Sequence, residues 1–260
     1  MRESRDLTRQ IVVAASAVIA IIGSFVGSGA AGGTPIQEAS GGALSATSTP
    51  IAPDVPAFSI WSVIYLGLIA YAIWQILPKQ SAAERHRRLG YWVATSLLLN
   101  AAWILSVQFN LLVLSLPIIA ALVVVLARAF VICIKTTPSG TIDAIITDAT
   151  IGLYLGWVTI ATAANATALL VALGFRGFGL SSDGWAVAVI AVAGIIGVLL
   201  AIAGRGRIAP ALSLSWGLAW VAAGRLAGEL VSVPAGIAAI TAAVVVLVAT
   251  AVARVRSLRV

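Results

Sequence analysis

Long apolar stretches alternate with short polar segments along the whole chain, and each stretch has the length of a membrane-spanning helix. A bilayer core about 30 Å thick requires roughly 20 apolar residues in a helix. Pro210 and Pro234 favour helix starts, because proline suits the first helical turn, and Asp143 can cap a helix. The pattern predicts eight spans, over residues 7–27, 57–77, 89–109, 111–134, 143–173, 185–203, 210–226 and 233–252.

The first span has a second interpretation. Arg2, Arg5 and Arg9 precede the apolar residues 11–22, an arrangement also found in cleaved signal peptides. Cleavage would leave seven spans. The sequence pattern alone leaves both counts open.

Basic residues are distributed unequally between the predicted connections. With eight spans, fourteen of the sixteen Lys and Arg residues fall on one side, and only Arg176 and Arg225 fall on the other. Short cytoplasmic loops collect Lys and Arg, so both termini are predicted to be cytoplasmic. Residues 30–56 contain no basic residue and are rich in Gly, Ser, Thr and Pro. They predict a flexible outer loop that is either a lid or a spacer.

Composition excludes several classes of protein. Apolar residues make up 61% of the 260 and charged residues 10%, which is incompatible with a water-soluble domain. The net charge of +7 comes from short flanks at helix ends rather than from one patch, so nucleic-acid binding is not expected. One cysteine, Cys133, and one histidine, His86, allow neither a disulfide framework nor a typical metal site. No catalytic motif is present, and no metal or cofactor is predicted.

The few charged residues near the spans have ordinary explanations. His86 lies among four charged residues and is predicted to be a solvated loop histidine. Asp143 and Asp148 begin the fifth span, where negative charge complements the helix dipole. Arg225 and Glu229 are four residues apart and are predicted to pair with each other.

Aromatic and amide side chains inside three spans are more informative, because buried amides in a membrane must bind protein or ligand. Within each span they share one helix face, and the topology places all three faces in the outer half of the membrane. We therefore expect a cavity beneath residues 30–56 that suits a planar apolar ligand. For Asn100 we favour an interhelical bond. The stripes are Trp61 and Tyr65 in the second span, Asn100 and Trp103 in the third, and Tyr154, Trp157, Ala161 and Asn165 in the fifth.

Three segments carry a resemblance to a known family, the tryptophan-rich sensory protein or translocator protein (TspO/MBR) family. Residues 57–65, Ala-Phe-Ser-Ile-Trp-Ser-Val-Ile-Tyr, resemble its second-helix motif F-x-x-W-x-x-L-Y. Residues 99–103, Leu-Asn-Ala-Ala-Trp, resemble the third-helix L-N-x-x-W. Residues 154–165 are similar to the fifth-helix Y-L-x-W-x-x-x-A-T-x-x-N, the most specific of the three.

The resemblance covers residues 7–173 and implies an all-α integral membrane protein. Residues 1–173 would form the family's five-helix bundle with its first helix retained, and residues 174–260 a three-helix membrane extension, giving eight helices. The bundle would bind porphyrin, haem or another planar apolar ligand. By resemblance the ligand-binding residues are Trp61, Tyr65, Asn100, Trp103, Trp157, Ala161 and Asn165, with Tyr154 on the same stripe.

The first loop departs from the family pattern, because it contains Pro50, Pro53 and Pro56 but no tryptophan. The expected function is a non-enzymatic receptor or carrier in a bacterial cytoplasmic membrane. The alternatives are a secondary transporter of another small apolar solute and a porphyrin-degrading activity. Paired glycines such as Gly152 and Gly156 provide close-packing faces, which would serve either the extra helices or a homodimer.

Overall fold

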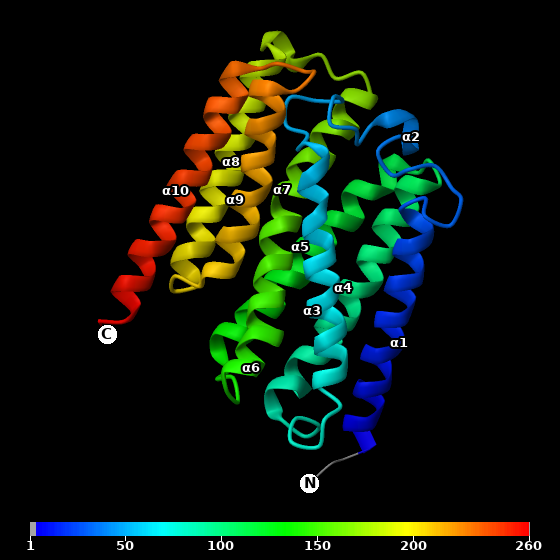
Figure 1. The fold of residues 1–260 in the computed structure, drawn as a ribbon, viewed down its shortest axis with the longest axis vertical. Coiled ribbons are helices and arrows are strands. Elements are labelled where there is room, and N and C mark those ends of the chain that lie inside the picture. Colours follow the sequence, from blue (N-terminus) through cyan, green and yellow to red (C-terminus); the bar gives the residue numbers. More distant parts are fainter. Residues whose placement is uncertain (1–3, 260) are drawn as a thin grey trace.

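The computed structural model describes residues 4–259, which form a bundle of roughly antiparallel helices (Figure 1). Both ends of the described chain lie at one end of the bundle, which we call the terminal end, and residues 28–59 lie at the other, the loop end (Figure 1). The long helices are α1 (Ser4–Gly27), α3 (Ile60–Trp74), α4 (Glu84–Gln108), α5 (Leu112–Lys135), α7 (Thr150–Ala172), α8 (Ser182–Ala203), α9 (Ile208–Ala227) and α10 (Val233–Ser257).

Short elements complete the architecture. The first loop contains α2 (Ala39–Gly42) and η1 (Val55–Ser59), and η3 (Gly177–Gly179) precedes α8. The helix that contains α7 begins earlier, with α6 (Thr141–Asp143) and a π-helical segment η2 (Ala144–Ala149). Together α6, η2 and α7 form one span, Thr141–Ala172, of 32 residues.

Seven helical segments within the described residues are long and apolar enough to cross a membrane, and the chain is a multi-pass membrane protein. They coincide with seven of the eight predicted spans. The remaining one, residues 210–226, is a 20-residue helix, α9, but is not among the seven. Its serines, tryptophans and Arg225 lower its hydropathy, and a helix packed among other helices needs less apolar surface than one facing lipid.

The outer faces of the bundle carry large exposed apolar side chains. Leu66 is 69% exposed, Val124 67% and Ile195 60%. In water this surface would be unfavourable, whereas in a bilayer it contacts lipid chains. The helices bury polar, small and large apolar residues between them, such as Leu68 and Leu97, and present further aliphatic residues outward.

Small residues set the contacts between the predicted five-helix part and the last three helices. A Cβ added at Gly152 would lie 2.8 Å from Cβ of Ala209, and one at Gly156 would collide with the carbonyl oxygen of Pro210. The two glycines thus let α9 pack closely against α7. The predicted small face is used within one chain, to dock the last three helices.

Basic residues gather at the terminal end, as the predicted sidedness requires. The turns at residues 75–83, 136–140 and 204–207 all lie there, together with the described ends of the chain. Arg2 lies outside the described residues. Arg176 and Arg225 are at the loop end, after α7 and near the end of α9.

Candidate ligand-binding site

Beneath the first loop lies a small cavity of about 40 Å³. It is lined by the three tryptophans of the predicted site, each from a different helix: Trp61 of α3, Trp103 of α4 and Trp157 of α7. Ala161 and Asn165 of α7 line it too, one and two turns beyond Trp157. The structure therefore brings five of the eight predicted site residues around one space.

The aromatic rings of the cavity wall pack mainly edge to face. Trp61 is central: its ring centroid lies 6.5 Å from that of Trp103 in a stacked arrangement and 6.2 Å from that of Trp157 at 85°. Phe58 of η1 adds a fourth ring, 5.8 Å from Trp157 at 78°. Edge-to-face geometry of this kind stabilises aromatic clusters.

Hydrogen bonds around the cavity satisfy Asn165 but not Trp157. The Asn165 side chain accepts from Trp103 Nε1 at 3.0 Å and donates to Ser115 Oγ at 2.8 Å, so it links α7 to α4 and α5. Trp157 is only 1% exposed, and within the described residues its Nε1 has no hydrogen-bond acceptor. A buried, unpaired N–H costs free energy, and it would be satisfied by an acceptor on a bound ligand.

Two other predicted residues, Tyr65 and Asn100, line a different space. This groove of about 510 Å³ lies between α1, α3 and α4. Asn100 donates to the Tyr65 hydroxyl at 2.5 Å, the interhelical bond that the sequence favoured, and the same hydroxyl contacts Ser24 of α1. Tyr154 lines neither space: it is fully buried, packs against Trp61 at 5.8 Å and donates to the carbonyl of Ser96.

The groove and the cavity beneath the first loop share a wall. Phe58, Trp61 and Trp103 line both spaces, so these three rings separate them. Phe58 was not among the predicted site residues, but it belongs to the second-helix motif, and this motif is the sequence feature that could have identified it. A rotation of Trp61 would change the size of both spaces at once.

The first loop, for which the sequence left a lid and a spacer open, forms the roof of the cavity. Five of its residues line the cavity from above, all within residues 43–53, which we call the roof: Ala43, Leu44, Ser48, Ala52 and Pro53. None of them is a tryptophan, although tryptophans are usual in the first loop of the family that the chain resembles. The roof therefore closes the cavity without contributing a ring of its own.

Arg225 holds the roof and does not pair with Glu229, contrary to the sequence prediction. Its guanidinium is 1% exposed and donates to the carbonyl oxygens of Ala46 at 2.5 Å and Thr49 at 3.1 Å. No ion pair of Arg225 occurs within residues 4–259. The prediction failed because helical spacing says nothing about a loop that precedes Arg225 by 176 residues.

At the terminal end, a buried network corrects the prediction for His86. The histidine lies in the first turn of α4 and is fully buried, with its Nε2 3.3 Å from Gln80 Oε1 and 3.8 Å from Asp143 Oδ1. The predicted span began at residue 89, because the mostly charged residues 84–88 lower the hydropathy. In the structure α4 begins at Glu84, so these residues form its first turn, and His86 lies within the bundle.

Asp143 and Asp148 do more than complement a helix dipole. Asp143 accepts hydrogen bonds from Trp74 Nε1 at 3.1 Å and Thr147 Oγ1 at 2.8 Å. Asp148 pairs with Arg85 of α4 at 2.6 Å and with Arg207, from the turn before α9, at 2.8 Å. The network thus joins the predicted five-helix part to the last three helices.

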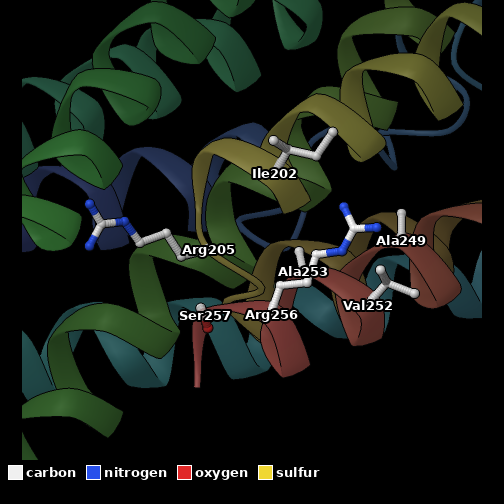
Figure 2. Close-up of a pocket in the computed structure, with 7 residues that line it drawn as sticks. All are labelled: Ile202, Arg205, Ala249, Val252, Ala253, Arg256 and Ser257. Atoms are coloured by element: carbon white, nitrogen blue, oxygen red, sulfur yellow. The ribbon is translucent and has the colours of Figure 1, made fainter. Parts of the chain in front are cut away.

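The terminal end also contains a hollow lined by basic residues. A larger hollow of about 770 Å³ between the ends of α8 and α10 is lined by Arg205 and Arg256, but their guanidinium groups point away from each other (Figure 2). Among the described residues, no group of three His, Cys, Asp or Glu side chains could hold a metal ion.

Comparison with known proteins identifies the family. No curated protein and no solved structure matches the chain. A family model described as "TSPO-like protein" matches residues 12–251. The match continues beyond residue 173, where the motif resemblance ends, and covers α8, α9 and most of α10. Because this model spans nearly the whole chain, the protein belongs to the TSPO-like family.

Proposed function

We propose that the protein is a membrane receptor or carrier that binds a tetrapyrrole-like ligand, porphyrin or haem, in the aromatic cavity beneath the first loop. The observation that carries the proposal is the convergence of Phe58, Trp61, Trp103 and Trp157 on one space. Membership of the TSPO-like family supports it. Binding without chemical conversion fits the cavity, since its lining offers indoles, one amide and a serine but no acid or base.

The unpaired N–H of Trp157 supports a ligand that carries hydrogen-bond acceptors. An aliphatic solute would fill the cavity but leave this donor unsatisfied. Pyrrole nitrogens and carboxylates are acceptors, and both occur in tetrapyrroles. We therefore favour this class over the small apolar solute of the transporter alternative.

Binding requires the cavity to enlarge. Sites for ligands of this size occupy about 300 to 1,000 Å³, whereas the cavity beneath the roof has about 40 Å³. The described structure is the closed state in this proposal. Either the roof lifts or the wall shared with the groove moves.

The proposal includes eight membrane helices, with a five-helix binding part, residues 1–173, and a three-helix extension, residues 174–260. In this arrangement α9 crosses the membrane inside the bundle, and both termini are cytoplasmic. A reporter fused at Ser45 and one fused after residue 260 should lie on opposite sides of the membrane. Reporters on the same side would contradict the eight-helix topology.

Protoporphyrin binding tests the function directly. A porphyrin in the cavity would quench the emission of the surrounding indoles saturably in detergent. Trp157→Leu should weaken binding by about 1 to 3 kcal/mol, the range for a buried aromatic contact. The control is Trp185→Leu, at the start of α8 outside the cavity, which should leave affinity unchanged. Equal weakening by both variants would mean that porphyrin only partitions into the micelle.

Trp157→Phe separates ligand recognition from folding. This change keeps an aromatic ring and removes the unpaired donor, so relief of the unsatisfied N–H offsets part of the packing lost with the smaller ring, and the free energy of unfolding in detergent should change by less than about 1 kcal/mol. Affinity for protoporphyrin should fall by about 1 kcal/mol, the usual net value of a hydrogen bond. If neither the affinity nor the stability changed, Trp157 Nε1 would not be a hydrogen-bond donor to the ligand.

A further inference from the structure

Helix α9 contacts the first loop at several points besides Arg225. Trp216 Nε1 donates to the carbonyl of Ala57 at 3.0 Å. The backbone N–H of Asp54 donates to the carbonyl of Trp220 at 3.3 Å. Gly224 lies beside the same residue: a Cβ there would be in van der Waals contact with Cβ of Asp54, at 3.4 Å. The second half of α9 therefore runs along the loop that covers the cavity.

The roof residues bound by α9 are interleaved with those that line the cavity. Leu44 and Ser48 line the cavity, while the carbonyls of Ala46 and Thr49 accept from Arg225. A shift of Arg225 would therefore move cavity-lining residues directly. The contact is local to the roof and does not depend on any side chain of the roof itself.

The environment of Arg225 is suited to a contact that forms and breaks. Its guanidinium donates to two carbonyl oxygens, and its Nε has no acceptor within the described residues. The Asp54 carboxylate attracts this charge without forming an ion pair with it. A buried guanidinium with an unpaired N–H and no direct ion pair is only partly compensated for its lost hydration. The hydrogen bonds of Arg225 therefore stabilise the closed state, but by less than a fully paired buried arginine would.

We propose that Arg225 is a positioning residue for the candidate site, and that α9 latches the roof over the cavity. In this inference the last three helices control access to the cavity: release of Arg225 and Trp216 lets the roof lift and admits the ligand. The latch itself rests on the contacts above. Only its effect on ligand binding rests on the proposed function.

Alkylation of a cysteine placed under the roof measures opening without any ligand. Ala168 lines the cavity and is 4% exposed, so Ala168→Cys reports access to it. The native Cys133 is replaced by alanine to remove background. In the full-length chain in detergent, Arg225→Gln should accelerate modification by a water-soluble maleimide on the order of ten-fold, because it removes two charge-assisted hydrogen bonds.

Trp216→Phe removes a single neutral donor and should accelerate alkylation by a smaller factor, about three-fold. It also carries the test if Arg225→Gln does not fold. The matched controls lie in the same three-helix part: Arg176→Gln changes an exposed arginine, and Trp185→Phe removes a similar bond, from its Nε1 to the carbonyl of Gly177 at 2.8 Å. Neither control should alter the rate. Equal alkylation in all variants would overturn the latch.

The association rate of protoporphyrin then tests the effect on binding. It should rise in the order in which alkylation rises, because a larger open fraction increases the rate of productive encounter. Faster alkylation with an unchanged association rate would overturn the control of access and point instead to the wall shared with the groove. If protoporphyrin bound to no variant, including the unmodified chain, the proposed function would fail while the alkylation result still decided the latch.

Discussion

The two ends of the bundle are held together by different chemistry. At the terminal end, Asp148 pairs with Arg85 and Arg207, and Asp143 accepts from Trp74 and Thr147. At the loop end, the bonds around the cavity are mostly between neutral groups, as in the pairing of the Trp103 indole with the Asn165 amide. The exception, Arg225, binds carbonyls rather than a carboxylate.

This difference determines which end can open. Breaking one partner of a buried ion pair typically costs about 3 to 5 kcal/mol, because a charge is left uncompensated. A neutral hydrogen bond contributes a net of about 0.5 to 1.5 kcal/mol. The terminal end therefore clamps the helices, and rearrangement at the loop end is cheaper. We expect ligand-linked motion to be confined to the roof and the aromatic wall.

The largest expected effect is at the clamp. Asp148→Asn leaves Arg85 and Arg207 without their shared carboxylate and should lower the free energy of unfolding by about 3 to 5 kcal/mol. Thermal or denaturant unfolding in detergent measures it. If the free energy of unfolding fell by less than about 1 kcal/mol, Asp148 would act only on the helix dipole, and the two ends would not differ in how strongly they are held.

A smaller effect is expected at the loop end. Trp103→Phe leaves the Asn165 oxygen without its donor while the bond to Ser115 persists, so stability should fall by about 1 to 3 kcal/mol. The same unfolding assay applies, with Trp92→Phe as a control, since Trp92 is 36% exposed. A cost equal to that of Asp148→Asn would mean that both ends are held with similar strength.

The smallest effect is expected for an exposed ion pair at the terminal end. Arg88 and Glu84 lie one turn apart on α4, 59% and 63% exposed, with a 2.9 Å contact. Arg88→Gln should change stability by at most about 0.5 kcal/mol, because solvent screens the pair. A larger loss would show that surface charge, and not only the buried network, contributes to the clamp.

The sequence predicts the helices well, because hydrophobic length is a local property. The predicted span 143–173 corresponds to the helical segment Thr141–Ala172, and 233–252 lies within α10. The errors are at ends that carry charge. Glu84 begins α4 about five residues before the predicted start, since charges that are paired inside a bundle do not stop a helix.

The candidate site was only partly predictable. Helical periodicity placed Trp157, Ala161 and Asn165 on one face, and the structure has all three at one cavity. Tyr154 shares the stripe but lies one turn deeper, where side chains leave no space. Periodicity also cannot pair helices with loops. For that reason the partners of Arg225 could not be read from the sequence.

The Arg225 contact also has a consequence for how this loop can change during evolution. The guanidinium binds main-chain oxygens, so the identity of the side chains at positions 46 and 49 does not enter the interaction. Substitutions there are compatible with closure, whereas an insertion or deletion between position 49 and η1 would shift the carbonyls out of reach. As far as this contact is concerned, changes of side chain at positions 46 and 49 should therefore be tolerated, and changes in loop length should not.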